Sequence, residues 1–124
     1  MKKILIVEDD PVSSRALCDY LSANGFYTTV ARTGPEGVAS FAQELPDLML
    51  VDVQLPLKNG FEVCFDVRQT DYGRNVPILL MSAVYTDREH AEPYAKRGLG
   101  AADYLVKPFS MRAMLERVHS LIGD

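Results

Sequence analysis

The sequence predicts an α/β fold in which helices cover both faces of a single, doubly wound parallel sheet. Short apolar runs alternate along the 124 residues with segments in which apolar residues recur every three or four positions, and this alternation is typical of βα units. Three runs, at about 3–8, 47–52 and 77–82, are almost continuously apolar, as expected of central strands buried on both faces. We therefore expect five strands in one domain that spans residues 1–124.

Two further strands complete the predicted sheet. Residues 27–31 mix polar and β-branched side chains, which suits a strand at the edge of a sheet. The last strand is expected at about 102–106. It is short, and a Lys-Pro pair follows it.

Four helices are predicted from the apolar periodicity, at about 12–23, 35–44, 60–70 and 111–122. Pro11 marks the start of the first helix, and Asn24-Gly25 marks its end. The side chains expected to face the core are Val12, Ala16, Leu17, Tyr20 and Leu21; Val38, Phe41 and Ala42; Phe61, Cys64 and Val67; and Met111, Met114, Leu115, Val118, Leu121 and Ile122.

The segment between the last two strands is harder to interpret. Thr86 or Asp87 would cap a helix, but Pro93 follows closely, removes a hydrogen-bond donor and clashes with the preceding turn. The sequence leaves two alternatives: a kinked helix, or a short turn at 87–91 followed by a helix that begins near Pro93.

The composition excludes several classes of function. The net charge is −4 and no basic patch is present, so direct binding of nucleic acid is not expected. The apolar runs are far shorter than the roughly 18 residues of a membrane span, and the N-terminus does not resemble a signal peptide. Cys18 and Cys64 lie far apart and are expected to be reduced, as in a cytoplasmic protein. His90 and His119 are expected on helix surfaces.

Polar residues end or directly follow four of the predicted strands. They are Glu8, Asp9 and Asp10 after the first, Asp52 at the end of the third, Ser82 at the end of the fourth and Lys107 after the fifth. Because parallel strands end at one edge of a sheet, these side chains are expected to share a crevice of the kind that binds ligands. The carboxylates would repel one another, and a hard cation such as Mg²⁺ relieves that repulsion. The set predicts a site for a divalent cation and a phosphoryl group.

Within this set, the three adjacent acids are expected to differ in role. Asp9 and Asp52 are predicted to bind the cation directly, and Glu8 through water. Asp10 stands just before Pro11, so for this residue we favour the alternative that it caps the following helix.

Four stretches of the chain together resemble the receiver domains of two-component response regulators, in particular the single-domain regulators of chemotaxis. They are Ile-Leu-Ile-Val-Glu-Asp-Asp-Pro at 4–11, Val-Asp-Val-Gln-Leu-Pro at 51–56 with Asn-Gly at 59–60, Met-Ser-Ala at 81–83, and Gly-Ala-Ala-Asp-Tyr-Leu-Val-Lys-Pro-Phe at 100–109. The resemblance covers essentially the whole chain. It implies a flavodoxin-like (βα)5 fold with the strand order 2-1-3-4-5.

The resemblance also implies a function. Asp52 corresponds to the phosphoacceptor, which takes a phosphoryl group from a phosphohistidine on a sensor histidine kinase or a histidine phosphotransfer protein. It implies a Mg²⁺ site made by Glu8, Asp9, Asp52 and the backbone carbonyl of Gln54. Lys107 would pair with the phosphoryl oxygens, aimed by a cis peptide bond before Pro108.

Ser82 and Tyr104 correspond to the family's switch residues, whose movement transmits phosphorylation to the face formed by the helical segment around Pro93, the strand at 102–106 and the helix at 111–122. That face would bind a downstream protein or output domain, or form a phosphorylation-dependent dimer.

Two side chains would flank the attacking water in self-dephosphorylation: Gln54, which is polar, and Val84, which is not. We therefore expect slow hydrolysis. A static aromatic remains the alternative for Tyr104, as does plain surface for Gln54.

Other functions fit the residues less well. A degenerate receiver that docks partners without phosphorylation is disfavoured because Asp9, Asp52, Ser82 and Lys107 are all present. A phosphatase with an aspartyl-phosphate intermediate would need a second acid two residues beyond an aspartate nucleophile on the first strand, whereas Asp9 is followed at that distance by Pro11. A nucleotide-binding flavodoxin-like protein would need a Gly-rich loop after the first strand. The sequence names neither the cognate kinase nor the output, and it leaves open whether the chain works alone or within a longer protein.

Overall fold

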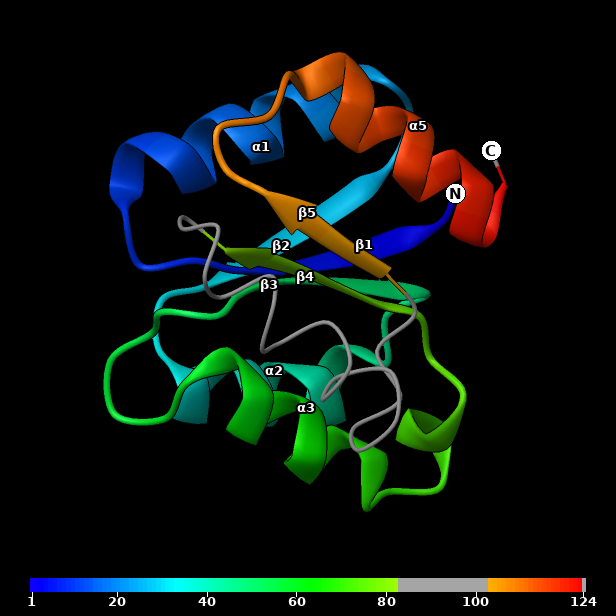
Figure 1. Cartoon of the computed structure of the whole chain (residues 1–124). Coiled ribbons are helices and arrows are strands. Elements are labelled where there is room, and N and C mark those ends of the chain that lie inside the picture. The colour runs from blue at the N-terminus through cyan, green and yellow to red at the C-terminus, as the bar shows by residue number, and fades with distance from the viewer. Residues whose placement is uncertain (83–102, 124) are drawn as a thin grey trace.

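In a computed structural model of the chain, which describes residues 1–82 and 103–123, five parallel strands form one sheet between two layers of helices (Figure 1). The strand order is β2-β1-β3-β4-β5, and every neighbouring pair is parallel. This arrangement confirms the predicted sheet. The strands are β1 (Lys3–Val7), β2 (Tyr27–Ala31), β3 (Leu48–Asp52), β4 (Ile78–Ser82) and β5 (Asp103–Val106).

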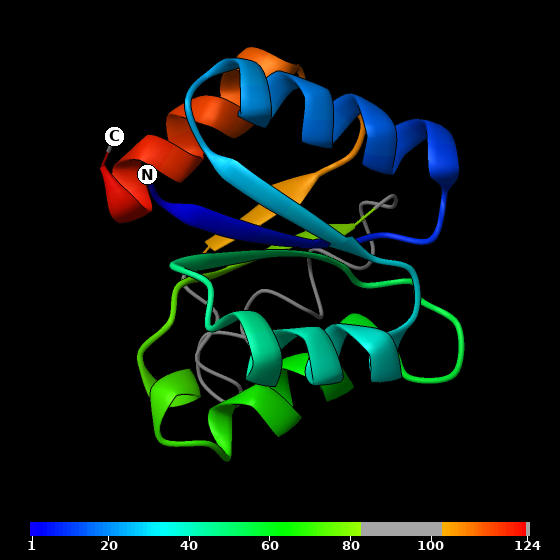
Figure 2. The ribbon, with the colours of Figure 1, turned by 180° about the vertical axis from the view of Figure 1, so that it is seen from behind.

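Helices α1 and α5 cover one face of the sheet, and α2 and α3 cover the other (Figures 1 and 2). The bounds are α1 (Pro11–Ala23), α2 (Gly34–Glu44), α3 (Gly60–Arg68) and α5 (Met111–Ile122). These match the four helices predicted from periodicity within two residues at every end. The helix expected between residues 83 and 101, with both of its alternatives around Pro93, lies outside the described residues, and so does His90.

The end of α3 departs from the prediction of a helix that continues to residue 70. The helix ends at Arg68, and a short 3-10 helix, η1 (Tyr72–Arg74), follows. The Arg68 guanidinium donates hydrogen bonds to the carbonyls of Gly73 and Val76, and Thr70 bonds back to the carbonyl of Val67. These local bonds replace the helical pattern and turn the chain towards β4.

Each face of the sheet has its own apolar core because side chains alternate along a strand. Leu5, Met49 and Leu80 point towards α2 and α3, where they pack with Phe41 and Val67. The alternate residues of the same strands point towards α1 and α5. They form a second cluster from Ile4, Ile6, Leu48, Leu50, Leu79 and Met81 with Leu17, Leu21, Met114 and Val118.

Three of the side chains expected in the core are instead exposed. The Val12 side chain is 76% exposed, and Ala16 and Ala42 are exposed as well. Helix α1 buries Ser14, Leu17 and Leu21, and at 100° per residue Val12 lies on the face opposite Leu21. The expectation for these three side chains was therefore wrong, whereas Leu17, Leu21 and Phe41 on the same two helices are buried as predicted.

The remaining expectations from composition concern the cysteines, His119 and membrane spans. Cys18 and Cys64 are both free thiols, as predicted, and His119 is exposed on α5. No helix in the described ranges 1–82 and 103–123 has both the length and the apolar character needed to cross a membrane.

Candidate functional site

The strand register brings the predicted polar residues to one edge of the sheet. Val7 pairs with Val51, so Glu8 lies beside Asp52, the last residue of β3. Val106 pairs with Ser82 at the end of β4, so Lys107 follows at the same level. The shared crevice expected from the sequence is thus present at the carboxyl ends of β1, β3, β4 and β5.

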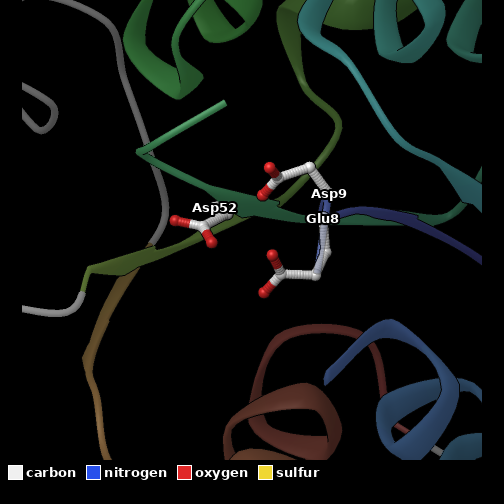
Figure 3. A group of neighbouring side chains, drawn as sticks. All are labelled: Glu8, Asp9 and Asp52. Atoms are coloured by element: carbon white, nitrogen blue, oxygen red, sulfur yellow. The ribbon is translucent and has the colours of Figure 1, made fainter. Parts of the chain in front are cut away.

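Three carboxylates form the centre of this edge. One oxygen from each of Glu8, Asp9 and Asp52 lies within 4.8 Å of the others, close enough to hold one metal ion. Figure 3 shows the Glu8 and Asp9 side chains leaving the end of β1 on opposite sides, with both carboxylates turned towards Asp52. Glu8 is 1% exposed and Asp52 5%, whereas Asp9 is exposed.

The Asp52 carboxylate is held at both of its oxygens. Its Oδ1 accepts a hydrogen bond of 2.9 Å from the backbone N–H of Gln54, and its Oδ2 accepts one of 2.8 Å from Lys107 Nζ. The start of α3 packs directly beneath, because Gly60 N donates to the carbonyl of Val53 at 2.8 Å. A Cβ atom at Gly60 would lie 2.4 Å from the carbonyl oxygen of Asp52, so only glycine permits this approach.

Lys107 bridges two of the carboxylates. Its Nζ lies 2.9 Å from Glu8 Oε1 and 2.8 Å from Asp52 Oδ2, and the peptide bond to Pro108 is cis. Burial lowers the pKa of Lys107, but the hydrogen bonds to Asp52 and Glu8 outweigh it and leave the pKa above its usual value. The site therefore contains an ammonium group beside Asp52 that is charged at neutral pH.

Glu8 is a buried carboxylate with two anchors. Besides the bond from Lys107, its Oε2 accepts a hydrogen bond of 3.2 Å from the backbone N–H of Asp10. Burial raises the pKa of the Glu8 carboxyl group, against the opposing effect of the bonds from Lys107 and Asp10. No hydrogen bond or ion pair reaches the Asp9 carboxylate from any residue that the structure describes, so a cation would meet least competition there.

Asp10 has the role that we favoured for it. It is the N-cap of α1, and its side chain accepts a hydrogen bond from the backbone N–H of Ser13 at 3.1 Å. Hydrogen bonding from the Ser13 side chain, and then from its backbone N–H, lowers the pKa of the Asp10 carboxyl group. The structure thus separates Asp10 from the other two acids of the triplet.

An open hollow of about 590 Å³ adjoins the group of carboxylates at Asp9. It is lined by Asp9, Val53, Gln54, Leu55, Pro56, Asn59 and Phe61. The Gln54 side chain is exposed, while its backbone N–H holds Asp52. The hollow is thus open to solvent beside Asp9 and the loop that follows Asp52.

Ser82 and Tyr104, the predicted switch pair, are both buried. Ser82 is fully buried at the end of β4, and its carbonyl accepts a hydrogen bond of 2.6 Å from the backbone N–H of Lys107. Tyr104 is 6% exposed and packs in the cluster with Leu80. Val84, predicted to flank the attacking water, lies outside the described residues.

Sequence reasoning missed the direct contact between Glu8 and Lys107. The sequence assigned Lys107 to a phosphoryl group and Glu8 to a metal-bound water. The sequence predicted that both residues share the sheet edge, but strand order alone does not show which of the acids at that edge Lys107 contacts.

Comparison with known proteins identifies the family. The family model for the response regulator receiver domain matches residues 4–119, and the chain belongs to this family. Its relatives include the response regulator MprA of Mycobacterium ulcerans, 36% identical over 97% of this chain and 50% of that protein. Another is the DNA-binding dual master transcriptional regulator RpaA of a Synechocystis strain, 34% identical over 98% of this chain and 49% of RpaA. The chain spans about half the length of these relatives.

Solved structures show the same fold. The receiver domain of the sensor histidine kinase PA1611 from Pseudomonas aeruginosa PAO1, which has a magnesium ion coordinated in its active-site cleft, matches with a TM-score of 0.87 and 30% identity. The two chains cover each other to 99% and 98%. The BeF3-activated receiver domain of Klebsiella pneumoniae RstA matches with a TM-score of 0.85 and 30% identity, over 98% of this chain and 99% of that one.

Proposed function

We propose that this receiver domain is a phosphorylation switch in which Asp52 accepts a phosphoryl group from a phosphohistidine on a sensor histidine kinase or a histidine phosphotransfer protein. The observation that carries the proposal is the setting of Asp52. Its carboxylate is held by the Gln54 N–H and the Lys107 ammonium next to an open hollow. A fixed nucleophile beside a fixed positive charge is what phosphoryl transfer requires, because catalysis there is mostly positioning and charge stabilisation.

The reaction moves one phosphoryl group. An Asp52 carboxylate oxygen forms the new bond to phosphorus while the bond from phosphorus to the histidine nitrogen breaks, and the imidazole keeps the electron pair. The product is an aspartyl phosphate. Lys107 then lies where its ammonium group pairs with the phosphoryl oxygens.

The donor set fits a magnesium ion. Three carboxylates lie within 4.8 Å and one ammonium group compensates at most one of their charges, so a divalent cation is favoured there. Asp9 and Asp52 would hold it directly, with the Gln54 carbonyl, and Glu8 through water. When bound, Mg²⁺ supplies Lewis-acid stabilisation of the charge on the phosphoryl oxygens.

The conformational response would pass through Ser82 and Tyr104. The Ser82 hydroxyl would bind the new phosphoryl group, and Tyr104 would change its packing, as a shift between two existing arrangements. Ser82→Ala should still be phosphorylated but respond weakly. The ring signals of Tyr104, compared by NMR with and without beryllofluoride and Mg²⁺, decide this: an unchanged ring in the wild type would favour a static aromatic.

The proposed partners follow from the same switch. The output surface would be the face that β5 and α5 form with the helix expected between residues 83 and 101. It would bind a downstream protein, an output domain or a second copy of the chain. RpaA is a DNA-binding regulator by name. We expect no direct contact between the present domain and nucleic acid, because the net charge of this chain is −4 and the phosphate backbone is negatively charged. The free thiols agree with a cytoplasmic setting.

The lifetime of the phosphorylated state would depend on Gln54 and Val84. An apolar side chain at position 84 cannot orient water, so self-dephosphorylation should be slow, and Val84→Glu should accelerate it. Decay of the phosphorylated form after removal of excess donor, at constant Mg²⁺, measures the effect. A Val84→Glu rate no higher than that of the wild type would contradict it.

The main test is incubation with acetyl phosphate and Mg²⁺ followed by intact-mass measurement. The wild type should gain the mass of one phosphoryl group, while Asp52→Asn and a wild-type sample in chelator should gain none. Absence of the gain in the wild type would favour a degenerate receiver that docks partners without phosphorylation.

A further inference from the structure

We propose that Glu8 is a positioning residue for Lys107: it anchors the ammonium group while Lys107 exchanges its bond to Asp52 for a bond to the phosphoryl group. The inference rests on the proposed function of Asp52. It starts from the bridge that Lys107 Nζ makes between Glu8 Oε1 at 2.9 Å and Asp52 Oδ2 at 2.8 Å.

The two carboxylates in this bridge differ in whether phosphorylation changes them. Glu8 is 1% exposed, its Oε2 is tied to the backbone N–H of Asp10, and its own N–H donates to the carbonyl of Ala31 at 3.0 Å. It is therefore fastened to the main chain at both ends. Asp52 is the group whose chemistry changes, because phosphorylation converts its carboxylate to an acyl phosphate and moves the negative charge to the phosphoryl oxygens.

Lys107 needs such an anchor. Its side chain is a flexible four-carbon stem, 24% exposed to solvent, and it carries three donors on one nitrogen. With Glu8 in place, one donor stays on Oε1 while another turns from Asp52 Oδ2 to a phosphoryl oxygen. Without the Glu8 charge, the lysine would have no fixed partner at the moment when Asp52 ceases to be one.

This role differs from a role of Glu8 towards the metal through water. If Glu8 acts through Lys107, a Glu8 substitution has little effect once Lys107 has been replaced. If Glu8 acts on the cation, its effect is independent of Lys107. A double-mutant cycle separates the two, because only groups that act through one another give a non-additive result.

The first measurement is NMR of lysine residues labelled at Cε, with the Lys107 signal assigned from its absence in Lys107→Met. In the wild type we expect the two Hε protons of Lys107 to have distinct chemical shifts, both in the protein alone and with beryllofluoride and Mg²⁺. In Glu8→Gln the two shifts should merge into one averaged value, most completely when beryllofluoride and Mg²⁺ are bound. Asp10→Asn, which makes the same acid-to-amide change at the helix cap two residues away, is the matched control and should leave the signal unchanged. An unaltered Lys107 signal in Glu8→Gln overturns the proposal.

The second measurement is the rate of phosphorylation by acetyl phosphate at saturating Mg²⁺, followed by intact mass. We expect Glu8→Gln to slow the reaction about tenfold with Lys107 present, and less than about twofold in the Lys107→Met background. Equal slowing in both backgrounds overturns the proposal in favour of a metal role. If the wild type itself is not phosphorylated, the proposed function fails, whereas the NMR signal of the unloaded protein still tests the anchor.

Discussion

In strands β1 and β3, the body and the carboxyl end are built from opposite kinds of side chain. Ile4, Ile6 and Leu50 are at most 1% exposed and belong to one apolar cluster of the core. At the carboxyl ends of the same strands lie Glu8 and Asp52, which are also buried, at 1% and 5% exposure, but are acidic. Burial of apolar area stabilises the fold, whereas burial of like charges opposes it. Apolar packing in the middle of the sheet therefore stabilises the fold, and the buried carboxylates at its carboxyl edge lower that stability.

The largest expected effect concerns the body. Leu50→Ala removes a fully buried side chain from the α1 and α5 side of the sheet, and it should lower the free energy of unfolding by about 3 kcal/mol. Urea unfolding measures it. Leu50 lies two residues before Asp52 on β3 but carries no polar group of the site, so the phosphorylation rate of the folded fraction should change little. A loss below about 1 kcal/mol in the free energy of unfolding would mean that apolar packing in the middle of the strands is not the main source of stability.

The next effect concerns the bridge at the edge. Lys107→Met leaves Glu8 and Asp52 without their counter-charge. Because both carboxylates are buried, the substitution should lower the free energy of unfolding in chelator by about 2 kcal/mol. The pKa of Lys107 lies above its ordinary value of 10.5. The contribution of the charged Lys107 side chain to the free energy of unfolding is therefore fully present below pH 10.5 and is lost as the pH rises through the folded-state pKa. The difference between wild type and variant, measured by urea unfolding across this range, should shrink above pH 10.5. A constant difference would contradict the ion-pair explanation.

A smaller effect of opposite sign is expected at Asp9. Its carboxylate is exposed, and Lys107 bonds the other two carboxylates of the group rather than this one. Asp9→Asn should relieve repulsion and raise the melting temperature in chelator by about 2 °C, while abolishing Mg²⁺-dependent phosphorylation. Thermal unfolding with and without Mg²⁺ tests both parts. A lower melting temperature together with intact phosphorylation would remove Asp9 from the metal site.

The smallest effect separates core from surface on α1. Val12 was expected to face the core but is 76% exposed, so Val12→Ala should change the free energy of unfolding by less than about 0.5 kcal/mol. Leu17→Ala, on the buried face of the same helix, is the control and should cost several times more. Equal losses in the two variants would restore the sequence-based assignment.

The sequence predicts the sheet well because each strand carries its own signal. The runs around Leu50 and Leu80 are apolar without interruption, and this pattern is decided locally. The alignment of Asp52 with Glu8 and Lys107 followed as well, since parallel strands must end together. The buried face of α1 was predicted at Leu17 and Leu21, but its width was not, because Val12 and Ala16 extend the apolar pattern and only packing shows how much of the helix is covered.

Contacts between side chains lay further beyond reach. The bond from Lys107 to Glu8 depends on side-chain length and on the anchors of each carboxylate, neither of which is encoded in periodicity. The end of α3 at Arg68 likewise depends on carbonyls at Gly73 and Val76 that the fold brings into range.

The central claim, that Asp52 is the phosphoacceptor among the three carboxylates, is tested most directly by chemical mapping. After incubation with acetyl phosphate and Mg²⁺, borohydride reduces an aspartyl phosphate to homoserine, and mass spectrometry of peptides locates the converted residue. We expect homoserine at position 52 in the wild type and none without Mg²⁺. Conversion of Asp9 instead, or of no residue in a protein that has gained phosphoryl mass, would contradict the assignment of Asp52.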